Sequence, residues 1–228
     1  MGFSGGLLKA VRSRLRTQSP SPMLVHPIPG RPHFLRPQHV AADARLFANR
    51  ESMVAGLGLP QNSVVAEVGV AKGAFTAVLL DTLHPKTFIA IDNFQMHVGQ
   101  DPRTAHEDFV FDGVTQLDFY QQRFGDRVVI DQGDSADRLS RYDSDYFDMI
   151  YIDAGHDYDS VKADAQAAKS KVKVGGVLIF NDYLLLDPRG KPYGIVQAVN
   201  ELLTAGGFVI IGFALQINMF CDIALRRT

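Results

Sequence analysis

The sequence is poor in cysteine and has no long apolar run. Its 228 residues include a single cysteine, Cys221, which excludes a disulfide framework and any zinc site built on cysteines. No apolar run reaches the roughly 18 residues that a membrane-spanning helix needs. We therefore expect a soluble, cytoplasmic protein with no transmembrane segment. The length suits one sizeable α/β domain, with or without an extension.

Acidic residues are absent from the first forty positions, which hold six basic ones: Lys9, Arg12, Arg14, Arg16, Arg31 and Arg36. Removing these from the 23 Lys and Arg of the whole chain leaves 17 against 25 Asp and Glu, a net charge of −8 for the remainder. A net negative charge on residues 41–228 disfavours a broad surface that binds nucleic acid. We therefore expect no nucleic-acid partner.

The same forty residues hold six of the eleven prolines, which preclude a continuous helix or an interior strand there. We interpret residues 1–45 as a basic, proline-rich arm and residues 46–228 as the folded domain. Apolar residues recur every fourth position at the start of the arm and predict a short amphipathic helix: Phe3, Leu7, Val11 and Leu15. That helix could be a targeting peptide, lie on a membrane surface, or cap the domain or a partner subunit.

From about residue 46, apolar strands alternate with helical segments. The expected strands are Ser63–Val68, Thr87–Ile91, Arg127–Asp131, Phe147–Ile152, Val174–Phe180, Phe208–Phe213 and Met219–Leu225. The expected helices are Gly73–Leu83, Ala105–Phe124, Ser135–Arg141, Tyr158–Lys171 and Tyr193–Ala205. This alternation predicts an α/β fold with a doubly wound, mostly parallel sheet of seven strands. The last two strands are too close for a helical crossover, so they should form an antiparallel hairpin.

In such sheets ligands bind at the carboxyl ends of the strands, so the loops there carry the functional information. The first loop contains Glu67, Gly69, Val70 and Gly73, where glycines allow a tight turn beside the free N–H groups of the next helix. The spacing G-x-x-x-G differs from the G-x-G-x-x-G of pyrophosphate binders. It therefore disfavours an NAD(P)- or FAD-dependent oxidoreductase, and ordinary turn glycines remain an alternative.

Two further loops offer acids that suit an adenosine. Asp92 ends the second strand, where a carboxylate can accept hydrogen bonds from both ribose hydroxyls, or can simply cap a helix. Gly133, Asp134 and Ser135 follow the third strand. The Asp and Ser side chains could pair with the exocyclic amine and a ring nitrogen of adenine, or could form the N-cap of the next helix.

Oxygen ligands follow the fourth and fifth strands. Asp153, Asn181 and Asp182 could converge on one hard cation, which prefers carboxylate and amide oxygens. His156 follows Asp153 by three residues and could serve the same pocket as a general base. The alternative is that the two Asp residues only cap helices and that His156 only supports its loop.

Taken in this order, the loops resemble those of class I S-adenosylmethionine-dependent methyltransferases over roughly residues 60–228. The closer resemblance is to small-molecule O-methyltransferases of the macrocin type and, more distantly, of the catechol type. It implies that the Glu67–Gly73 turn binds methionine, Asp92 the ribose, and Gly133–Ser135 the adenine side. It also implies a magnesium site at Asp153, Asn181 and Asp182, with Asp153 beside the cofactor and His156 as the base.

Two positions depart from the family pattern. Ala71 stands where the commonest first motif has its middle glycine, and Asn181 stands where macrocin-type members often have a second aspartate. The family chemistry implies an in-line attack of a substrate oxygen on the sulfonium methyl group, in which His156 and Asp153 are the catalytic residues.

The resemblance implies a small-molecule acceptor whose identity the sequence does not give. Segments 93–107 and 186–193 are expected to shape its pocket. Three alternatives stay open: metal-independent N- or carboxyl-methylation, an oxidoreductase on the same sheet, and a non-catalytic interaction domain. A homo-oligomer is also possible.

Overall fold

A computed structural model describes residues 32–96, 98–99, 110–111, 113–187, 190–217 and 219–228. The helix expected near the start of the arm lies outside these residues. None of the helices in the described ranges has the length and apolarity needed to cross a bilayer.

The core of the protein is one sheet of eight strands in the order β1-β7-β8-β6-β5-β2-β3-β4. Its strands are β1 (Val40–Phe47), β2 (Val64–Val68), β3 (Thr87–Asp92), β4 (Val129–Gln132), β5 (Phe147–Ile152), β6 (Val172–Phe180), β7 (Phe208–Ala214) and β8 (Asp222–Arg227). All neighbouring strands are parallel except β8, which lies antiparallel between β6 and β7. The expected mostly parallel sheet with a C-terminal antiparallel pair is therefore confirmed.

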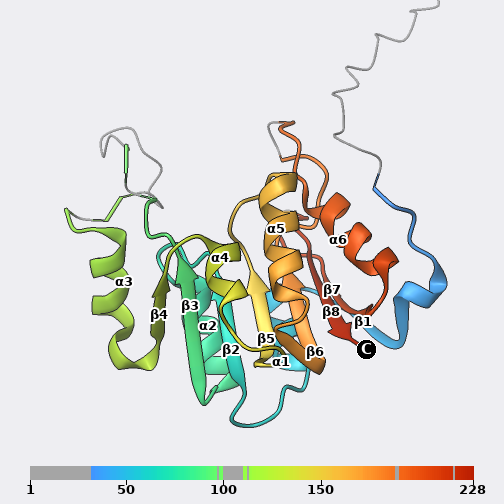
Figure 1. The fold of residues 1–228 in the computed structure, drawn as a ribbon, viewed down its shortest axis with the longest axis horizontal. Coiled ribbons are helices and arrows are strands. Elements are labelled where there is room, and N and C mark those ends of the chain that lie inside the picture. Colours follow the sequence, from blue (N-terminus) through green and yellow to red (C-terminus); the bar gives the residue numbers. More distant parts are fainter. Residues whose placement is uncertain (1–31, 97, 100–109, 112, 188–189, 218) are drawn as a thin grey trace, which may run out of the picture.

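Helices cover both faces of this sheet, as Figure 1 shows. They are α1 (Arg50–Gly56), α2 (Ala74–Leu83), α3 (Gln116–Phe124), α4 (Ser135–Ser140), α5 (Tyr158–Ala168) and α6 (Ile195–Ala205), with short 3-10 turns at Pro37–His39 and Gly125–Arg127. Side chains of α4, α5 and α6 pack in one apolar cluster and those of α1, α2 and α3 in another. Three helices therefore cover each face, with the sheet as the middle layer.

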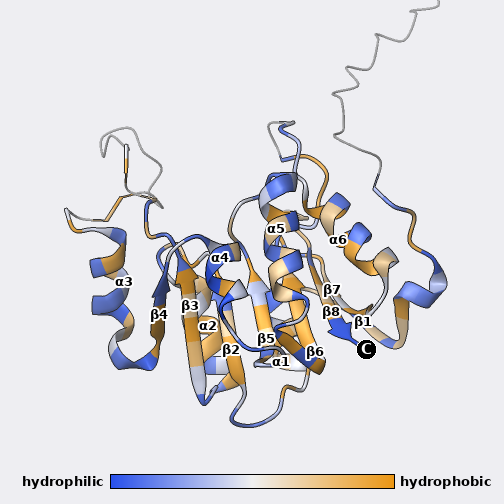
Figure 2. Cartoon of the chain, viewed as in Figure 1, coloured by the Kyte–Doolittle hydropathy of each residue, from blue (hydrophilic) through white to orange (hydrophobic). Residues whose placement is uncertain are grey.

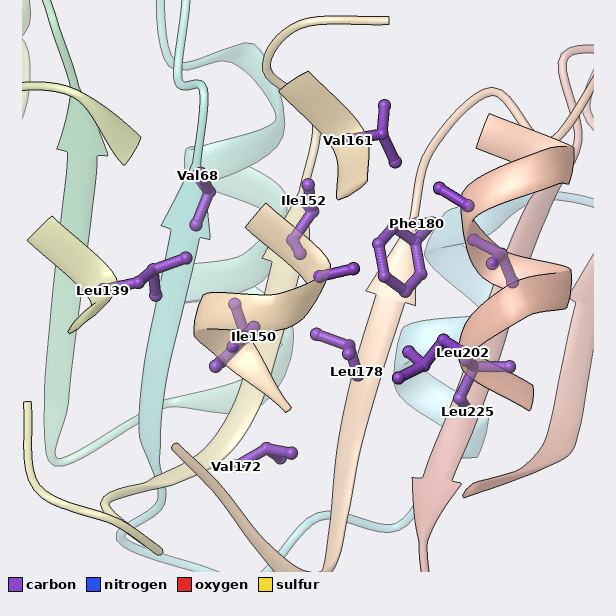
Figure 3. Close-up of a cluster of buried hydrophobic side chains, with 14 of the residues drawn as sticks. Val68, Leu139, Ile150, Ile152, Val161, Val172, Leu178, Phe180, Leu202 and Leu225 are labelled. Carbon is purple, nitrogen blue, oxygen red and sulfur yellow. The ribbon is translucent and has the colours of Figure 1, made fainter. Parts of the chain in front are cut away.

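The central strands of the sheet, such as β2 and β5, are apolar because both of their faces are buried. Successive residues of β2 enter opposite clusters: Val65 packs toward α1 and α2, and Ala66 toward α4, α5 and α6. Figure 2 shows hydrophobic stretches in the central strands, flanked by helices that mix hydrophilic and hydrophobic residues. Figure 3 shows the cluster on the side of α4, α5 and α6, where Val68, Ile152 and Phe180 from neighbouring strands lie side by side beneath the helices.

The sheet has one strand more than the seven expected. β1 was missed because it begins inside the segment interpreted as an arm, three residues after its last proline. Its residues are mostly exposed and show no apolar alternation, so its sequence carries no strand signal. The strand forms because it pairs in parallel with β7, where Val40 lies opposite Ile210. It is an edge strand, consistent with the exclusion of interior strands from this region.

Two elements begin three or more residues later than expected. The helix predicted from Ala105 begins at Gln116 in the described residues, because the Thr115 side chain accepts a hydrogen bond from Asp118 N and caps it. The last strand begins at Asp222 instead of Met219, since Met219 has a left-handed backbone with φ 60°. The short helix α1 was not predicted at all.

The strand order reverses between β2 and β5. From β2 the chain adds β3 and β4 outward on one side, and then returns to add β5 and β6 on the other. Loops that leave the carboxyl ends of β2 and β5 therefore diverge to opposite sides, and a crevice opens between them. A ligand site is expected at this crevice.

Candidate functional site

A cavity of about 670 Å³ lies at the carboxyl ends of β2, β3, β4 and β5. Ligand pockets for small molecules fall in this size range. The residues predicted to bind cofactor line it, with the exception of Gly73: Glu67, Gly69, Val70, Asp92, Gly133, Asp134, Ser135 and Asp153. Asp92 and Asp153 thus share one cleft although they are far apart in the chain.

The turn after β2 needs backbone freedom at three positions. Gly69 has φ 82°, and a Cβ there would overlap the carbonyl group of Asp153. Gly73 has φ 74° and borders the rings of Phe124 and Tyr120, so its role is helix packing and not contact with the cavity. Ala71 has φ 46°, a left-handed conformation that explains why a glycine is the commoner residue at this place.

The carboxylate of Asp92 is fixed by two backbone amides. Its Oδ2 accepts a hydrogen bond from Val70 N at 2.8 Å, and its Oδ1 accepts one from Phe94 N at 2.6 Å. Each oxygen keeps acceptor capacity beyond these bonds. The residue lines the cavity, so a ribose diol could bind to a carboxylate whose orientation is already set.

Glu67 is a buried acid in the cavity wall. It is 2% exposed and accepts a hydrogen bond from the hydroxyl of Thr76, which also lies 3.0 Å from the Tyr120 hydroxyl. Burial raises the pKa of Glu67 to about 8. A carboxyl group in this environment would be stabilised as an anion by a cationic ligand group, such as the ammonium of a bound amino acid.

In the loop after β4, the side chains of Asp134 and Ser135 bond to different partners. Asp134 caps α4, since its Oδ1 accepts a hydrogen bond from Asp137 N at 3.1 Å. Ser135 instead donates from its hydroxyl to Oδ1 of Asp164, on α5, at 2.5 Å. The capping alternative is therefore realised for Asp134, and a contact of either residue with adenine stays a prediction. Asp164 was not singled out from the sequence.

Asp164 should make the stability of the fold depend on pH. It is 1% exposed, and burial raises the pKa of its carboxyl to about 6. Because the folded-state pKa is raised, ionisation destabilises the fold as the pH climbs from about 4 to about 6, by at most about 3 kcal/mol. We expect Asp164→Asn to stabilise the protein at pH 7.5 and to have little effect at pH 4, as measured by urea unfolding.

The matched control is Asp159→Asn, an exposed position on the same helix. It should change the free energy of unfolding by less than about 0.5 kcal/mol at either pH. A gain from Asp164→Asn of equal size at both pH values would contradict the prediction.

His156 lies between two carboxylates. Its Nε2 is 3.6 Å from Oδ1 of Asp153 and 3.4 Å from Oδ2 of Asp182, and its ring stacks on Tyr193 with centroids 4.7 Å apart. Burial lowers the pKa of His156, but the two carboxylates outweigh this effect and raise it above the ordinary value. The backbone carbonyl of His156 also accepts a hydrogen bond from Gly194 N. The imidazole is thus packed against Tyr193 with Nε2 close to both carboxylates, although Nε2 makes no hydrogen bond to any described residue.

Asn181, one of the three predicted magnesium ligands, has its side-chain nitrogen bonded to two other residues. Asn181 is buried and donates its side-chain amide to Asp222 at 3.0 Å and to the Tyr151 hydroxyl at 3.3 Å. Within the described ranges, no group of three or more His, Cys, Asp or Glu residues is placed to hold a metal ion. These bonds engage Nδ2 and not Oδ1, which is the atom of Asn181 that would face a cation, so the triad of Asp153, Asn181 and Asp182 stays a prediction.

The two acids of that triad do converge. Asp153 and Asp182 face the same imidazole nitrogen from two strands, and burial followed by the charge of Asp153 raises the pKa of Asp182 to about 6. Two carboxylates with water suffice for many Mg²⁺ sites. The donor set therefore fits a divalent cation bound by Asp153 and Asp182 alone.

Arg50 is a site residue that the sequence analysis missed. It is the first residue of α1, and its guanidinium reaches the cavity wall, where Nη1 donates to the Tyr151 hydroxyl at 3.1 Å. Nη1 also lies 3.7 Å from Oδ2 of Asp153, and the guanidinium stacks 4.0 Å above the ring of Phe75. No spacing motif marks this arginine, because only the docking of α1 on the sheet brings it here.

Comparison with known proteins supports the coarser part of the resemblance, a methyltransferase, while the small-molecule O-methyltransferase type stays a prediction. A protein-family model described as a methyltransferase domain matches residues 66–183, slightly more than half of the chain. The matched segment runs from β2 to just beyond β6 and contains all of the predicted site residues. A search of curated proteins found no significant match.

Solved structures share the fold at low sequence identity. A SAM-dependent methyltransferase from Aquifex aeolicus is 13% identical with a TM-score of 0.52, covering 78% of this chain and 89% of that one. A ribosomal protein L11 methylase from Lactobacillus delbrueckii subsp. bulgaricus is 15% identical with a TM-score of 0.53, covering 78% and 76%. A fibrillarin pre-rRNA processing protein from Methanococcus jannaschii is 16% identical with a TM-score of 0.51, covering 79% and 76%.

Proposed function

Because the chain belongs to the methyltransferase-domain family and is an S-adenosylmethionine-dependent methyltransferase, we propose that it methylates a hydroxyl group of a small-molecule acceptor. The observation that carries the proposal is the imidazole of His156 held between Asp153 and Asp182 at the cavity. The family match also disfavours the oxidoreductase and the non-catalytic domain, which were the other interpretations of this sheet.

Bound S-adenosylmethionine supplies the methyl group as an electrophile. The chain itself orients the reactants: the backbone around Gly69 shapes the cavity floor, and Asp92 offers a fixed carboxylate to the ribose. Positioning of two reactants can be worth about 7–11 kcal/mol of the barrier. Glu67 is placed to meet the ammonium of the methionine end.

A hydroxyl is a weak nucleophile at neutral pH, so its proton must leave. We assign the proton to Nε2 of His156, where both neighbouring carboxylates stabilise the resulting imidazolium. Asp153 and Asp182 would also hold a Mg²⁺ ion, which would stabilise the acceptor oxygen as an anion. The amide oxygen of Asn181 would complete the predicted ligand set, since the bonds of this residue to Asp222 and Tyr151 use only the amide nitrogen.

A small acceptor is favoured over a nucleic acid by charge. Outside the first forty residues the chain carries a net charge of −8, and a phosphate backbone is repelled by such a surface. Asn93 and Met96 line the cavity from the segment expected to shape the acceptor pocket. Residues 97 and 100–107 of that segment lie outside the described residues.

The test is a methylation assay with a panel of phenols, sugar hydroxyls, amines, carboxylates and RNA, using methyl-labelled cofactor. We expect a product that carries an O-methyl group by mass spectrometry and NMR. We also expect activity to fall at least about tenfold in EDTA and to return with Mg²⁺. Methylation only of amines, carboxylates or RNA would contradict the proposed acceptor class.

The metal has an independent readout. Mg²⁺ should raise the melting temperature of the wild-type protein, because a ligand that binds only the folded state stabilises it. The same addition should leave the melting temperature of Asp182→Asn unchanged. Full activity in EDTA together with no Mg²⁺-dependent shift would remove the metal while leaving O-methylation by His156 in place.

A further inference from the structure

The cavity wall is acidic, and this poses a problem for one end of the cofactor. Five acids line it, Glu67, Asp92, Asp134, Asp153 and Asp164, against two side chains with a permanent positive charge, Arg50 and Lys72. S-adenosylmethionine carries a sulfonium and an ammonium group, which suit such a wall. Its α-carboxylate does not, so it needs a cationic partner within the cavity.

Arg50 has unused hydrogen-bonding capacity. Within the part of the chain that the structure describes, its guanidinium makes one hydrogen bond, to the hydroxyl of Tyr151. The carboxylates of Asp153 and Glu51 lie 3.7 Å and 3.9 Å away, which is too far for hydrogen bonds. A guanidinium has five N–H donors, so most of those of Arg50 remain open to a ligand.

The position of Arg50 matches the methionine end of the site. Its guanidinium packs 4.0 Å over Phe75, in the first turn of the helix that follows the Gly69 turn. Its side chain is 27% exposed, so a ligand can reach it. The other cation, the ammonium of Lys72, lies 5.5 Å from the ring of Phe111 and 6.0 Å from that of Phe119. Arg50 is therefore the cation beside Glu67, Gly69 and Asp153.

We propose that Arg50 binds the α-carboxylate of the cofactor, while the neighbouring acids receive its ammonium. A planar guanidinium can pair with a carboxylate through two parallel hydrogen bonds. At 3.7 Å the guanidinium of Arg50 is close enough to offset the negative charge of Asp153, while its N–H donors are not engaged by that acid and can bind the carboxylate of the ligand. Arg50 is thus a cofactor-specificity residue supplied by α1, a helix that lies outside the matched family segment.

The experiment measures binding without an acceptor, so it is independent of the proposed O-methylation. Two ligands are titrated by calorimetry: S-adenosylhomocysteine, and the same molecule without its carboxylate. We expect the wild-type protein to bind the complete ligand about 10- to 100-fold more tightly. Arg50→Met should lose this preference by weakening only the complete ligand, and Arg50→Lys should keep part of it.

Retained binding of the decarboxylated ligand shows that the Arg50→Met site is still folded. The matched control is Lys72→Met, which removes the other cation of the wall and should leave the ratio of the two affinities unchanged. The proposal is overturned if Arg50→Met weakens both ligands equally, if it weakens neither, or if Lys72→Met abolishes the preference instead.

Discussion

Replacement of His156 by alanine is expected to lower turnover by about 10²- to 10⁴-fold while leaving cofactor affinity unchanged. The imidazole contributes a proton acceptor held between Asp153 and Asp182, and alanine offers none. Turnover is measured with the best acceptor of the panel, and cofactor affinity by calorimetry. A change in affinity as large as the change in turnover would indicate a structural role.

Imidazole in solution provides a further check on this role. The ring of His156 is 31% exposed and stacks on Tyr193, so its removal leaves a space beside that ring. Added imidazole should restore part of the turnover of His156→Ala. The matched control is His33→Ala, which removes a histidine that bonds to Thr204 away from this cavity. His33→Ala should have the turnover of the wild-type protein. If His156→Ala keeps its full turnover and imidazole has no effect on it, His156 is not the general base.

Gly69→Ala is expected to destabilise the fold by about 3 kcal/mol or more and to abolish cofactor binding. Two costs combine at this position. Its φ of 82° is unfavourable for alanine by about 1–2 kcal/mol. In addition, the new methyl group would overlap the backbone of Asp153, so the tips of β2 and β5 must separate. That separation would widen the crevice and displace both site loops.

Gly58→Ala separates these two costs. Gly58 has φ 66°, but a Cβ there would meet no atom within 4 Å. Gly58→Ala should therefore lose only about 1–2 kcal/mol, which is what the left-handed backbone costs an alanine. For a chain of this size each kcal/mol lowers the melting temperature by about 2–4 °C. Cofactor binding should be unaffected. Equal destabilisation by the two substitutions would show that the contact with Asp153 is not strained by a methyl group.

The sequence was sufficient for those parts of the fold that burial dictates. β5 is buried at every position, so its apolar run could be recognised without knowing its neighbours. The glycines and acids at the strand ends were predictable for a related reason, since parallel strands bring their carboxyl ends to one edge. Asp92 and Asp153 share the cavity as expected.

Contacts between distant segments were not predictable. Nothing in the sequence indicates that the amide nitrogen of Asn181 donates to Asp222 on β8. Asp164 reads as an ordinary polar residue of α5, and only the packing of α4 on α5 buries it beside Ser135. Arg50 is the first residue of a helix of only seven residues, whose sequence shows no strong periodicity. In each case the decisive partner lies far away in the chain.

The pairing of β1 with β7 has a consequence for how the protein forms. Val40 lies opposite Ile210, so the first strand of the sheet cannot pair with β7 until the 170 residues that separate these two positions have been synthesised. Contacts of such large sequence separation slow folding because the loop-closure entropy is lost before the contact is gained. The sheet should therefore grow outward from its buried centre, with β1 arriving last. Arg50 lies three residues beyond the end of β1, so the arginine side of the cavity would be completed only at this final step.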